Sequence, residues 1–427
     1  MSNEVYAPLK GIRILSFELA FALPAGTRAL HDLGAEVVRV TPPGGNNFGR
    51  YVSVSDGVFH GKSCISIDLT KQEGRDIAMS LAIQADVVCN NFRPSVLTKY
   101  DLAAKVLRER KPELITLQMS GYGTPGPWSD FPAYGPSTEA AGGLNRLMVN
   151  EGEVPIRIGT GVFSDQLAGR HAALAIVAAL QRRAETGLGE DIDLSMTECI
   201  THLMGELMTE AVVSGEVPVS HGNRNPERVP QGIYPCVGDD EWIAISIEDD
   251  AMWRDFVEVS EQDMLNDSSY ETQQSRWKHH DKLDELIATW TSKWDKNELT
   301  ELLQTRRIAS APVRTVKDSA LDPQFQARGA LQLVEHQQPL FGYAAHPHPP
   351  LPWLMAGRIR KRLTDFRNNG EDNEEVLYRW LGMTKKEINR LEDEGVLYNE
   401  GPVQLGTFRI PQTNYDPEFG QKLGLPK

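Results

Sequence analysis

The sequence predicts an α/β protein that is built around a parallel β-sheet. Short apolar strands alternate with helical patterns along the first part of the chain. The first two strands enclose one helix, and strands that are joined in this way run parallel. In addition, a long apolar segment over 167–180 fits only a buried helix. These observations together favour a parallel sheet with a substantial core.

The first strand–helix–strand unit lies near the N-terminus. A strand over 9–17 is followed by a helical pattern over 24–33, which stops at Gly34. The second strand, over 36–40, is ended by two prolines and two glycines. This order is Rossmann-like, but the first turn carries no GxGxxG, which weighs against a dinucleotide site.

The alternation then continues, and we expect a strand over 64–69, a helix over 71–83, and strands over 85–89 and 114–117. A polar and aromatic turn, Asn-Asn-Phe-Arg-Pro at 90–94, follows the strand over 85–89. A rigid loop of glycines and prolines at 120–127 follows the strand over 114–117. Ligands of open parallel sheets bind at the carboxyl ends of the strands, so these turns are candidate binding positions.

Asp165 lies where the long buried helix begins. A carboxylate in the first turn of a helix is stabilised as the anion by the free N–H groups and the helix dipole. We therefore expect Asp165 to be ionised at neutral pH, as a carboxylate nucleophile requires. The alternative is that Ser164 caps the helix and that Asp165 is only a favourable acid of the first turn. The helix should end at Gly187, with a strand over 191–194 beyond it.

Length and charge limit the classes of function. The 427 residues are enough for two domains. There are 44 Lys plus Arg against 59 Asp plus Glu, a net charge of −15, which argues against binding to nucleic acid or to an anionic membrane. An anionic ligand would need a local basic pocket. There is no signal-peptide pattern and no run of eighteen apolar residues, so we expect a cytoplasmic protein.

The cysteines and histidines do not predict a metal site. The four cysteines have no CxxC spacing and lie in apolar surroundings, so we expect reduced core thiols. The run His-Pro-His-Pro-Pro at 346–350 is short and is interpreted as a rigid loop. No bound metal is therefore expected.

Several fragments together resemble the family III CoA-transferases, which include the formyl-CoA, carnitine and bile-acid CoA-transferases and the α-methylacyl-CoA racemases. The resemblance covers almost the whole chain. It is carried by the fragments PLKGIRILSF, DLGAEVVRV, ISIDLTKQEGR, ADVVCNNFRPSVL, SGYGTPGP, TGLGEDIDLSM, VPQGIYPCVGDDEWIAI, RIASAPVRTVKD, DPQFQARG and GEDNEEVLYRWLGMTKKEINRLEDEGV, in this order.

The resemblance implies a particular architecture. A large Rossmann-like domain would be made from both ends of the chain, 1–222 and 326–427, with the C-terminal residues as an arm. A smaller α/β domain, 223–325, would be inserted between them. Two such chains would form an interlocked homodimer. Composition changes near 220–231 and 310–315 agree with an inserted segment.

The resemblance also implies the chemistry. Asp165, in Ser-Asp-Gln-Leu-Ala-Gly at 164–169, matches the family's nucleophile and would carry an aspartyl-CoA thioester during transfer between an acyl-CoA and a carboxylic acid. CoA would be substrate and carrier, with no permanently bound cofactor. By position in the family pattern, the CoA contacts would come from Arg39, Pro42, Ile67, Thr70, Asn91, Phe92, Arg93, Lys99 and Tyr100, with Tyr134 and Gly135 nearby.

Oxyanions that form during the transfer would need N–H donors. Two groups of residues are candidates. One is Gly135 beside Tyr134. The other is the loop 222–232, which carries Asn223, Arg224 and Gln231 and which is alternatively only an interdomain linker.

The chain departs from the formyl-CoA transferases at three positions. Phe21 and Gly135 stand where they have a glutamine and a glutamate, and Glu139 stands where they have a glutamine. These changes argue against oxalate or formate and favour a larger or less polar acyl group. Two alternatives stay open: an acyl-CoA racemase, although no histidine lies near Tyr134 as a second base, and a CoA-binding protein without catalysis.

Overall fold

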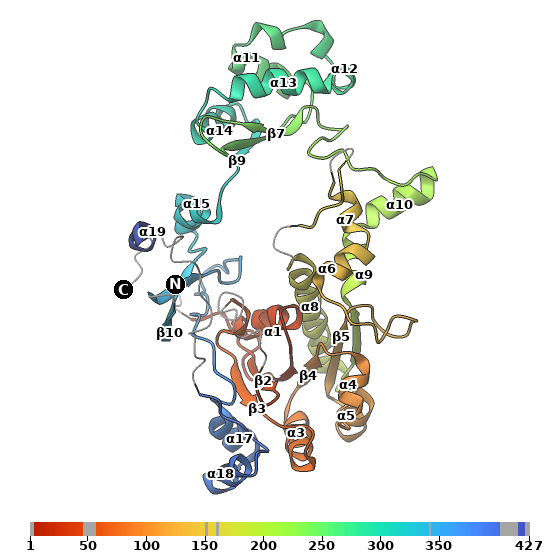
Figure 1. The fold of residues 1–427 in the computed structure, drawn as a ribbon, viewed down its shortest axis with the longest axis vertical. Coiled ribbons are helices and arrows are strands. Elements are labelled where there is room, and N and C mark those ends of the chain that lie inside the picture. Colours follow the sequence, from red (N-terminus) through yellow and green to blue (C-terminus); the bar gives the residue numbers. More distant parts are fainter. Residues whose placement is uncertain are drawn as a thin grey trace. The chain divides into compact units, whose positions relative to one another are not determined.

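The computed structural model describes residues 4–45, 57–149, 153–158, 162–340, 343–401 and 417–422 (Figure 1). The chain divides into two compact units. The larger unit contains Met1–Arg146, Arg157–Val217 and Pro323–Lys427, and the smaller contains Leu147–Ile156 and Pro218–Asp322. Both ends of the chain therefore belong to the larger unit.

The larger unit is organised around a six-stranded parallel sheet, which confirms the predicted α/β class. The strand order is β3-β2-β1-β4-β5-β6, so the chain order reverses between β1 and β4. Every neighbouring pair is parallel. The strands are β1 (Arg13–Phe17), β2 (Glu36–Thr41), β3 (Ser63–Ser66), β4 (Val87–Asn90), β5 (Ile115–Ser120) and β6 (Asp191–Ser195). Ligands of doubly wound sheets bind at such a reversal, outside the carboxyl ends of the strands.

Helices cover both faces of this sheet, which is why its strands are apolar along most of their length. Neighbouring residues of β1 point to opposite sides: Ile14 belongs to one buried cluster and Leu15 to the other. The cluster that contains Ile14 is covered by α1 (Ala22–Asp32), α8 (Phe163–Thr186) and α9 (Met196–Leu203). The other cluster is covered by α3 (Gln72–Gln84), α5 (Ala104–Arg110), α17 (Asn373–Leu381) and α18 (Lys385–Asp393).

The remaining elements of the larger unit are short. They are α4 (Pro94–Thr98), α6 (Gly135–Ala141), α10 (Gly205–Ser214), α16 (Pro323–Ala327), α19 (Pro417–Lys422) and the antiparallel hairpin of β10 (Gln332–Leu340) and β11 (Tyr343–His348). One further helix, α7 (Leu144–Leu147), ends at the first residue of the smaller unit. The interpretation of 346–350 as a loop was wrong in part, because its first three residues lie in β11 and pair with β10.

The smaller unit has its own apolar core. Its sheet is antiparallel, in the order β7-β8-β9, with β7 (Gln231–Pro235), β8 (Trp242–Ser246) and β9 (Ala309–Pro312). Its longer helices are α11 (Asp250–Ser260), α12 (Gln273–Lys278), α13 (His280–Thr291), α14 (Lys296–Thr305) and α15 (Val316–Leu321).

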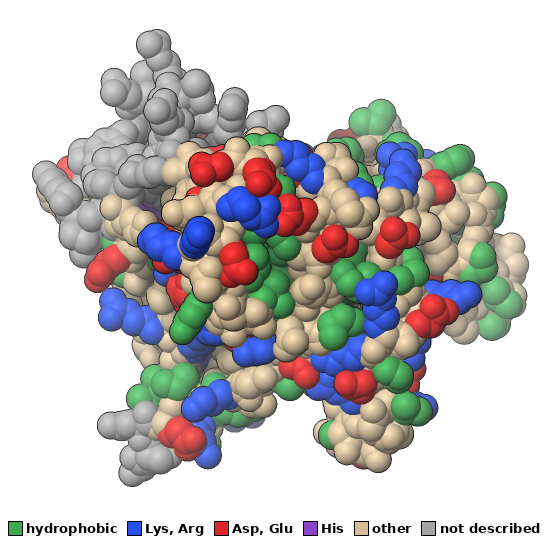
Figure 2. Space-filling model, turned by 90° about the horizontal axis from the view of Figure 1, so that it is seen from below, with side chains coloured by type: hydrophobic (Ala, Val, Ile, Leu, Met, Phe, Trp, Pro, Cys, Tyr) green, Lys and Arg blue, Asp and Glu red, His purple; other side chains and the backbone are tan. Residues whose placement is uncertain are grey.

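Three general features bear on the expectations from composition. All four cysteines are buried free thiols, which confirms their assignment as reduced core residues. Among the described residues, no helix is long and apolar enough to cross a membrane. On the face shown in Figure 2, acidic and basic side chains are interspersed with apolar ones.

Candidate functional site

Asp165 is positioned by the close packing of helix α8 on helix α1. Gly169, one turn after Asp165, lies against the first turns of α1: a Cβ atom added there would be 2.6 Å from the carbonyl oxygen of Ala22. A Cβ atom on Gly26 would in turn be 2.5 Å from the carbonyl oxygen of Gly169. Only glycine at both positions allows the backbones to approach so closely. The start of α8 is thereby fixed near the turn that follows β1.

Ser164 does not cap α8, contrary to the alternative considered for this segment. The helix begins at Phe163, and the cap position is held by Val162 without a side-chain hydrogen bond. The Ser164 hydroxyl instead donates to the carbonyl oxygen of Gly135 at 3.1 Å, and the Ser164 N–H donates to Glu139 Oε1 at 3.4 Å. Ser164 therefore ties the start of α8 to α6, and a carboxylate from α6 takes one of the free N–H groups of the helix.

Glu139 is a second carboxylate beside Asp165. Its side chain is fully buried, and its Oε2 has no hydrogen-bond partner among the described residues. The nearest cation is Arg157, whose Nε lies 3.7 Å from that oxygen and whose side chain is 41% exposed. Burial of a carboxylate costs free energy unless hydrogen bonds or an ion pair compensate for the lost hydration. A buried carboxylate with one oxygen left without a hydrogen bond is therefore unusual.

The pKa of Asp165 is raised from its ordinary value to about 6. Burial is the largest cause, since only 9% of the residue is exposed, and the charge of Glu139 adds to it. The Asp165 N–H and the charge of Arg157 act in the opposite direction. A carboxyl group with this pKa is mainly ionised at pH 7, by roughly ten to one. However, the helix terminus does not dominate the pKa, because burial outweighs it.

Tyr134 and Gly135 lie next to this carboxylate pair through α6. Gly135 is the first residue of α6 and is buried, and its carbonyl oxygen accepts the Ser164 hydrogen bond. Tyr134 precedes the helix and is 61% exposed. The structure thus brings Gly135, Glu139 and the first turn of α8 together, with Tyr134 at the solvent side.

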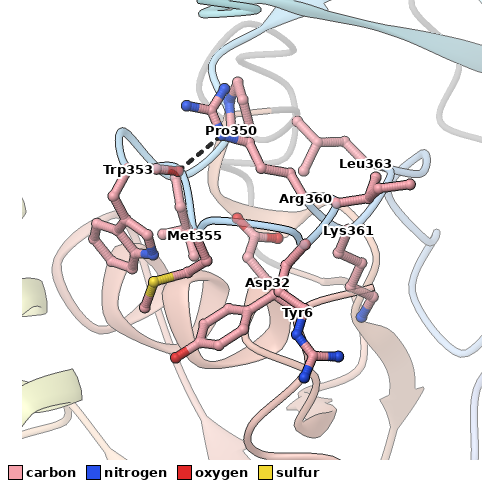
Figure 3. Close-up of a pocket in the computed structure, with 11 residues that line it drawn as sticks. Tyr6, Asp32, Pro350, Trp353, Met355, Arg360, Lys361 and Leu363 are labelled. Carbon is pink, nitrogen blue, oxygen red and sulfur yellow. Dashed lines mark hydrogen bonds between the residues drawn. The ribbon is translucent and has the colours of Figure 1, made fainter. Parts of the chain in front are cut away.

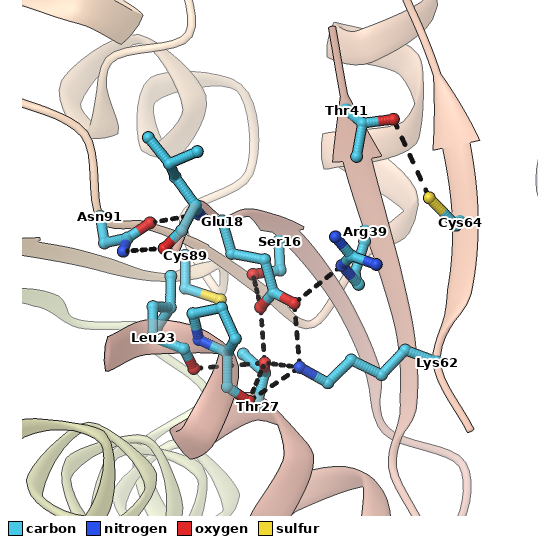
Figure 4. A network of polar contacts seen from close by, with 12 residues as sticks. Ser16, Glu18, Leu23, Thr27, Arg39, Thr41, Lys62, Cys64, Cys89 and Asn91 are labelled. Carbon is cyan, nitrogen blue, oxygen red and sulfur yellow. Dashed lines mark hydrogen bonds and ion pairs between the residues drawn. The ribbon is translucent and has the colours of Figure 1, made fainter. Parts of the chain in front are cut away.

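A buried ionic network supports the turn after β1 (Figure 4). Glu18 follows the last residue of β1, and its Oε1 lies 2.9 Å from Lys62 Nζ and 3.1 Å from Arg39 Nε. Its Oε2 accepts from the hydroxyls of Ser16 and Thr27, at 2.8 and 2.5 Å. Burial would raise the pKa of Glu18, but Lys62 and Arg39 outweigh it and hold the pKa below its usual range. Burial lowers the pKa of Lys62 to about 8.

Arg39 differs from what was expected of a phosphate ligand. Its side chain is 5% exposed, its Nε faces Glu18, and its guanidinium carbon lies 3.6 Å from the centre of the Phe59 ring. The Arg39 guanidinium therefore pairs with a carboxylate inside the protein. Ile67 is also in the core, with 1% exposure, so only its backbone could meet a ligand.

Asn91 joins the turns after β4 and β1, on either side of the chain reversal. Its side-chain oxygen accepts from the N–H of Leu19 at 2.8 Å, and its NH₂ donates to the carbonyl oxygen of Leu19 at 2.8 Å (Figure 4). Asn91 therefore shapes the edge of the sheet. Phe92 and Tyr100 are partly buried and pack against the apolar core.

The other predicted CoA contacts lie on the surface. Arg93 immediately precedes α4, and Lys99 immediately follows it. Both side chains are exposed, as are Pro42 after β2 and Thr70 before α3. The Thr70 hydroxyl donates to Asp68 at 2.6 Å. Arg93 and Lys99 are thus the accessible cations of the predicted set.

Two cavities lie apart from these residues. One, in the larger unit, lies between the N-terminal segment and residues 350–363 (Figure 3). Its basic side chains already have partners: Arg360 donates to the carbonyl oxygen of Trp353 at 2.9 Å, and Lys361 donates to that of His31 at 3.0 Å. None of the predicted site residues lines it.

The other cavity, of about 630 Å³, lies within the smaller unit and includes part of the loop 222–232. Arg224 donates there to Asp284 at 2.7 Å and pairs with Asp281 at 2.7 Å. The side-chain NH₂ of Gln231 donates to the carbonyl oxygen of Asn223 at 3.4 Å. This loop is therefore part of a folded pocket wall.

Sequence reasoning missed Glu18 and Lys62, and it did not give Glu139 a role. Glu18 could have been found from the sequence, because it is a polar residue directly after a buried apolar strand. Asn91 occupies a similar position after another strand. Glu139 had no comparable signal, since its burial depends on how α6 packs on α8.

The sequence matches the profile of CoA-transferase family III over residues 9–357. It is 29% identical to a succinyl-CoA–D-citramalate CoA-transferase of Chloroflexus aurantiacus, over 91% of this chain and 98% of that one. It is 30% identical to a succinyl-CoA:mesaconate CoA-transferase of Haloarcula hispanica, over 77% and 85%. The fold resembles that of a CAIB/BAIF family protein from Brucella suis, with a TM-score of 0.79 and 25% identity over 88% of this chain and 100% of that one.

Proposed function

This chain belongs to CoA-transferase family III, and we propose that it moves CoA from an acyl-CoA to a carboxylic acid through a covalent intermediate on Asp165. The observation that carries the proposal is the state of this side chain. It is a largely buried carboxylate in the first turn of α8 with a pKa of about 6. At neutral pH it is therefore ionised, yet more basic than an ordinary aspartate, and both properties favour nucleophilic attack.

The reaction proceeds in four steps. The Asp165 carboxylate attacks the thioester carbonyl of the donor and expels CoA thiolate, which leaves an acyl-aspartyl anhydride. The thiolate then attacks the aspartyl carbonyl, which forms an aspartyl-CoA thioester and releases the donor acid as its carboxylate. The acceptor carboxylate attacks this thioester and expels the thiolate again. Attack of the thiolate on the acceptor carbonyl gives the new acyl-CoA and restores Asp165, with no net transfer of a proton.

No general base is needed, because a thiolate is a good leaving group at neutral pH. What the site must supply is orientation and stabilisation of the oxyanions. We assign the oxyanion donors to backbone N–H groups at the starts of α6 and α8, other than the N–H of Ser164, which donates to Glu139. The exposed Tyr134 would cover the substrate from the solvent side.

CoA itself is proposed to lie along the carboxyl ends of the strands. Arg93 and Lys99 flank α4, the helix that follows β4, and as the exposed cations of the predicted set they are assigned to its phosphates. Pro42, Thr70 and the turn held by Asn91 would contact the nucleotide. Arg39 would act indirectly, by keeping the turn after β1 in place through Glu18.

The substrates are proposed to be short dicarboxylic acids and their CoA thioesters. Both relatives described above are named for transfer of CoA from succinyl-CoA to such an acid. A succinate–glutarate CoA-transferase of Agrobacterium fabrum, 29% identical over 75% of this chain and 84% of that one, also carries a dicarboxylate name. Arg157 is a partly exposed cation close enough to affect Asp165, and it suits the far carboxylate of such a substrate.

Phe21 agrees with a donor other than formyl-CoA or oxalyl-CoA. It is partly buried and packs with Ala25, Val58 and Phe59, so it presents no polar group. We also propose that the chain forms an interlocked homodimer in the cytoplasm. Its large domain would comprise 1–222 and 326–427, and its small domain 223–325.

The test is a screen by mass spectrometry in which succinyl-CoA is incubated with a panel of mono- and dicarboxylic acids. We expect new acyl-CoA products from dicarboxylic acceptors and none with Asp165→Ala, which should still bind CoA. Retained turnover by that variant would refute the assignment. Incorporation of solvent deuterium at Cα of an acyl-CoA, without an acceptor acid, would instead identify an isomerase. Glu139 does not suit the role of second base, because its side chain is fully buried.

A further inference from the structure

We infer that Glu139 is a positioning residue for the proposed nucleophile: from its buried place on α6 it holds the first turn of α8 and imposes a negative charge on Asp165, which Arg157 balances. The inference rests on the proposed function of Asp165. It gives a role to a residue that sequence reasoning left without one, and it concerns how the nucleophile is tuned.

The first support is geometric. Glu139 is in α6, yet its Oε1 accepts the N–H of Ser164, the residue before Asp165, at 3.4 Å. The Ser164 hydroxyl returns to α6 by donating to the carbonyl oxygen of Gly135 at 3.1 Å. Two hydrogen bonds thus connect α6 to the turn that carries Asp165. Because no side chain of α8 caps its own start, these contacts fix the position of that turn.

The second support is the unsatisfied oxygen. Glu139 Oε2 is buried without a hydrogen-bond partner among the described residues, and Arg157 Nε is 3.7 Å away. A glutamine at this position could offer the same acceptor to Ser164 and would avoid the cost of a buried charge. A structural role alone therefore does not explain the carboxylate. What a carboxylate adds is charge next to Asp165.

The charge acts in the direction that nucleophilic attack requires. Burial and Glu139 both raise the pKa of Asp165, whereas Arg157 lowers it. A negative neighbour makes the aspartate a stronger base and hence a better nucleophile toward a thioester. The positive neighbour keeps it ionised at neutral pH. The groups that affect Asp165 are thus Glu139 from α6, Arg157 from the segment before α8, and its own N–H.

The test uses two substitutions with opposite expected signs. Glu139→Gln keeps the shape and the acceptor for Ser164 and removes only the charge. Arg157→Gln removes the balancing cation. The measurement is the pre-steady-state rate at which succinyl-CoA modifies Asp165, followed from pH 4.5 to 8 by quenching and peptide mass spectrometry. Glu109→Gln, on the exposed face of α5, is the matched control.

We expect the ratio of the rate at pH 5 to the rate at pH 7.5 to rise roughly threefold to tenfold in E139Q, because Asp165 then stays ionised at lower pH. The plateau rate at high pH should fall. In R157Q the same ratio should fall, and E109Q should match the wild type. Unchanged ratios in both variants, or shifts in the same direction, would overturn the inference.

Failure of this inference is distinguishable from failure of the proposed function. If the wild type forms no adduct on Asp165, the proposed function fails. If the adduct forms with a pH dependence that neither substitution moves, only the role of Glu139 fails. If E139Q does not fold by circular dichroism, R157Q decides, because a ratio that does not fall contradicts the charge balance described above.

Discussion

The contact between α1 and α8 offers a sharp test of how Asp165 is held, through the substitution Gly169→Ala. In most helices this change stabilises by up to about 1 kcal/mol, because alanine has the higher helix propensity. Here the new Cβ would lie 2.6 Å from the carbonyl oxygen of Ala22, 2.9 Å from the N of Gly26 and 3.1 Å from the Cβ of Ala25. The two nearest atoms are backbone, so relief requires the helices to move apart. Overpacking of this kind typically costs about 1–3 kcal/mol.

We therefore expect Gly169→Ala to destabilise the protein by roughly 1–2 kcal/mol after the gain in propensity is included. The movement should also displace Asp165, which lies one turn before the contact, and lower kcat by at least about tenfold. The urea midpoint and steady-state transfer from succinyl-CoA would measure the two effects. Gly205→Ala, at the start of α10, is the matched control, since nothing lies within 4 Å of its added Cβ.

A Gly169→Ala variant that is as stable and as active as Gly205→Ala would refute this prediction. That outcome would mean that α1 and α8 are not in backbone contact, and that the position of Asp165 is set by other elements.

Asp165→Asn should be more stable than the wild type at pH 7.5, by up to about 3 kcal/mol, because the folded-state pKa is raised to about 6 from 3.8. Since the raised pKa costs stability only as pH rises from about 4 to 6, melting at pH 3.5 should show no difference, and a constant difference would contradict the assignment. Lys62→Met should lower the urea midpoint by the equivalent of about 3 kcal/mol, because Glu18 loses a buried partner; a loss no larger than for the exposed Lys105→Met would argue against the network. Ser164→Ala should cost about 1 kcal/mol and reduce kcat more than it changes KM, because it frees α8 from Gly135; an effect on KM alone would show that it does not position the nucleophile.

The fold was predictable because it depends on local patterns. Strands over 36–40 and 191–194 and the helix end at Gly187 agree with the structure to within a residue. The ends of strands were less predictable: the strand expected over 64–69 stops at Ser66, and an Asp68–Thr70 turn follows. Such a turn depends on side-chain hydrogen bonds, which apolar periodicity does not report.

The site was predictable only in part. The pKa and the accessibility of a charged side chain depend on residues that are distant in the sequence and close in the fold. The position of Asp165 in the first turn of a helix followed from sequence. The raised pKa did not, since it comes from burial and from Glu139, which is 26 residues earlier in the chain. Arg39 was expected to contact CoA from its position in the family pattern, and in the structure its side chain is turned toward Glu18 in the interior. Residue type and strand position thus indicate which end of the sheet carries the site. They do not show which cations there are accessible to a ligand.

The most direct test of the central claim is peptide mapping after incubation with succinyl-CoA and borohydride. The thioester on Asp165 should be reduced, so the peptide that contains this residue should carry the corresponding alcohol in place of its carboxylic acid. The change should be absent from Asp165→Asn and should disappear when acceptor acid is added before the reductant. An unmodified peptide in an enzyme that transfers CoA, or modification of another residue, would contradict the account.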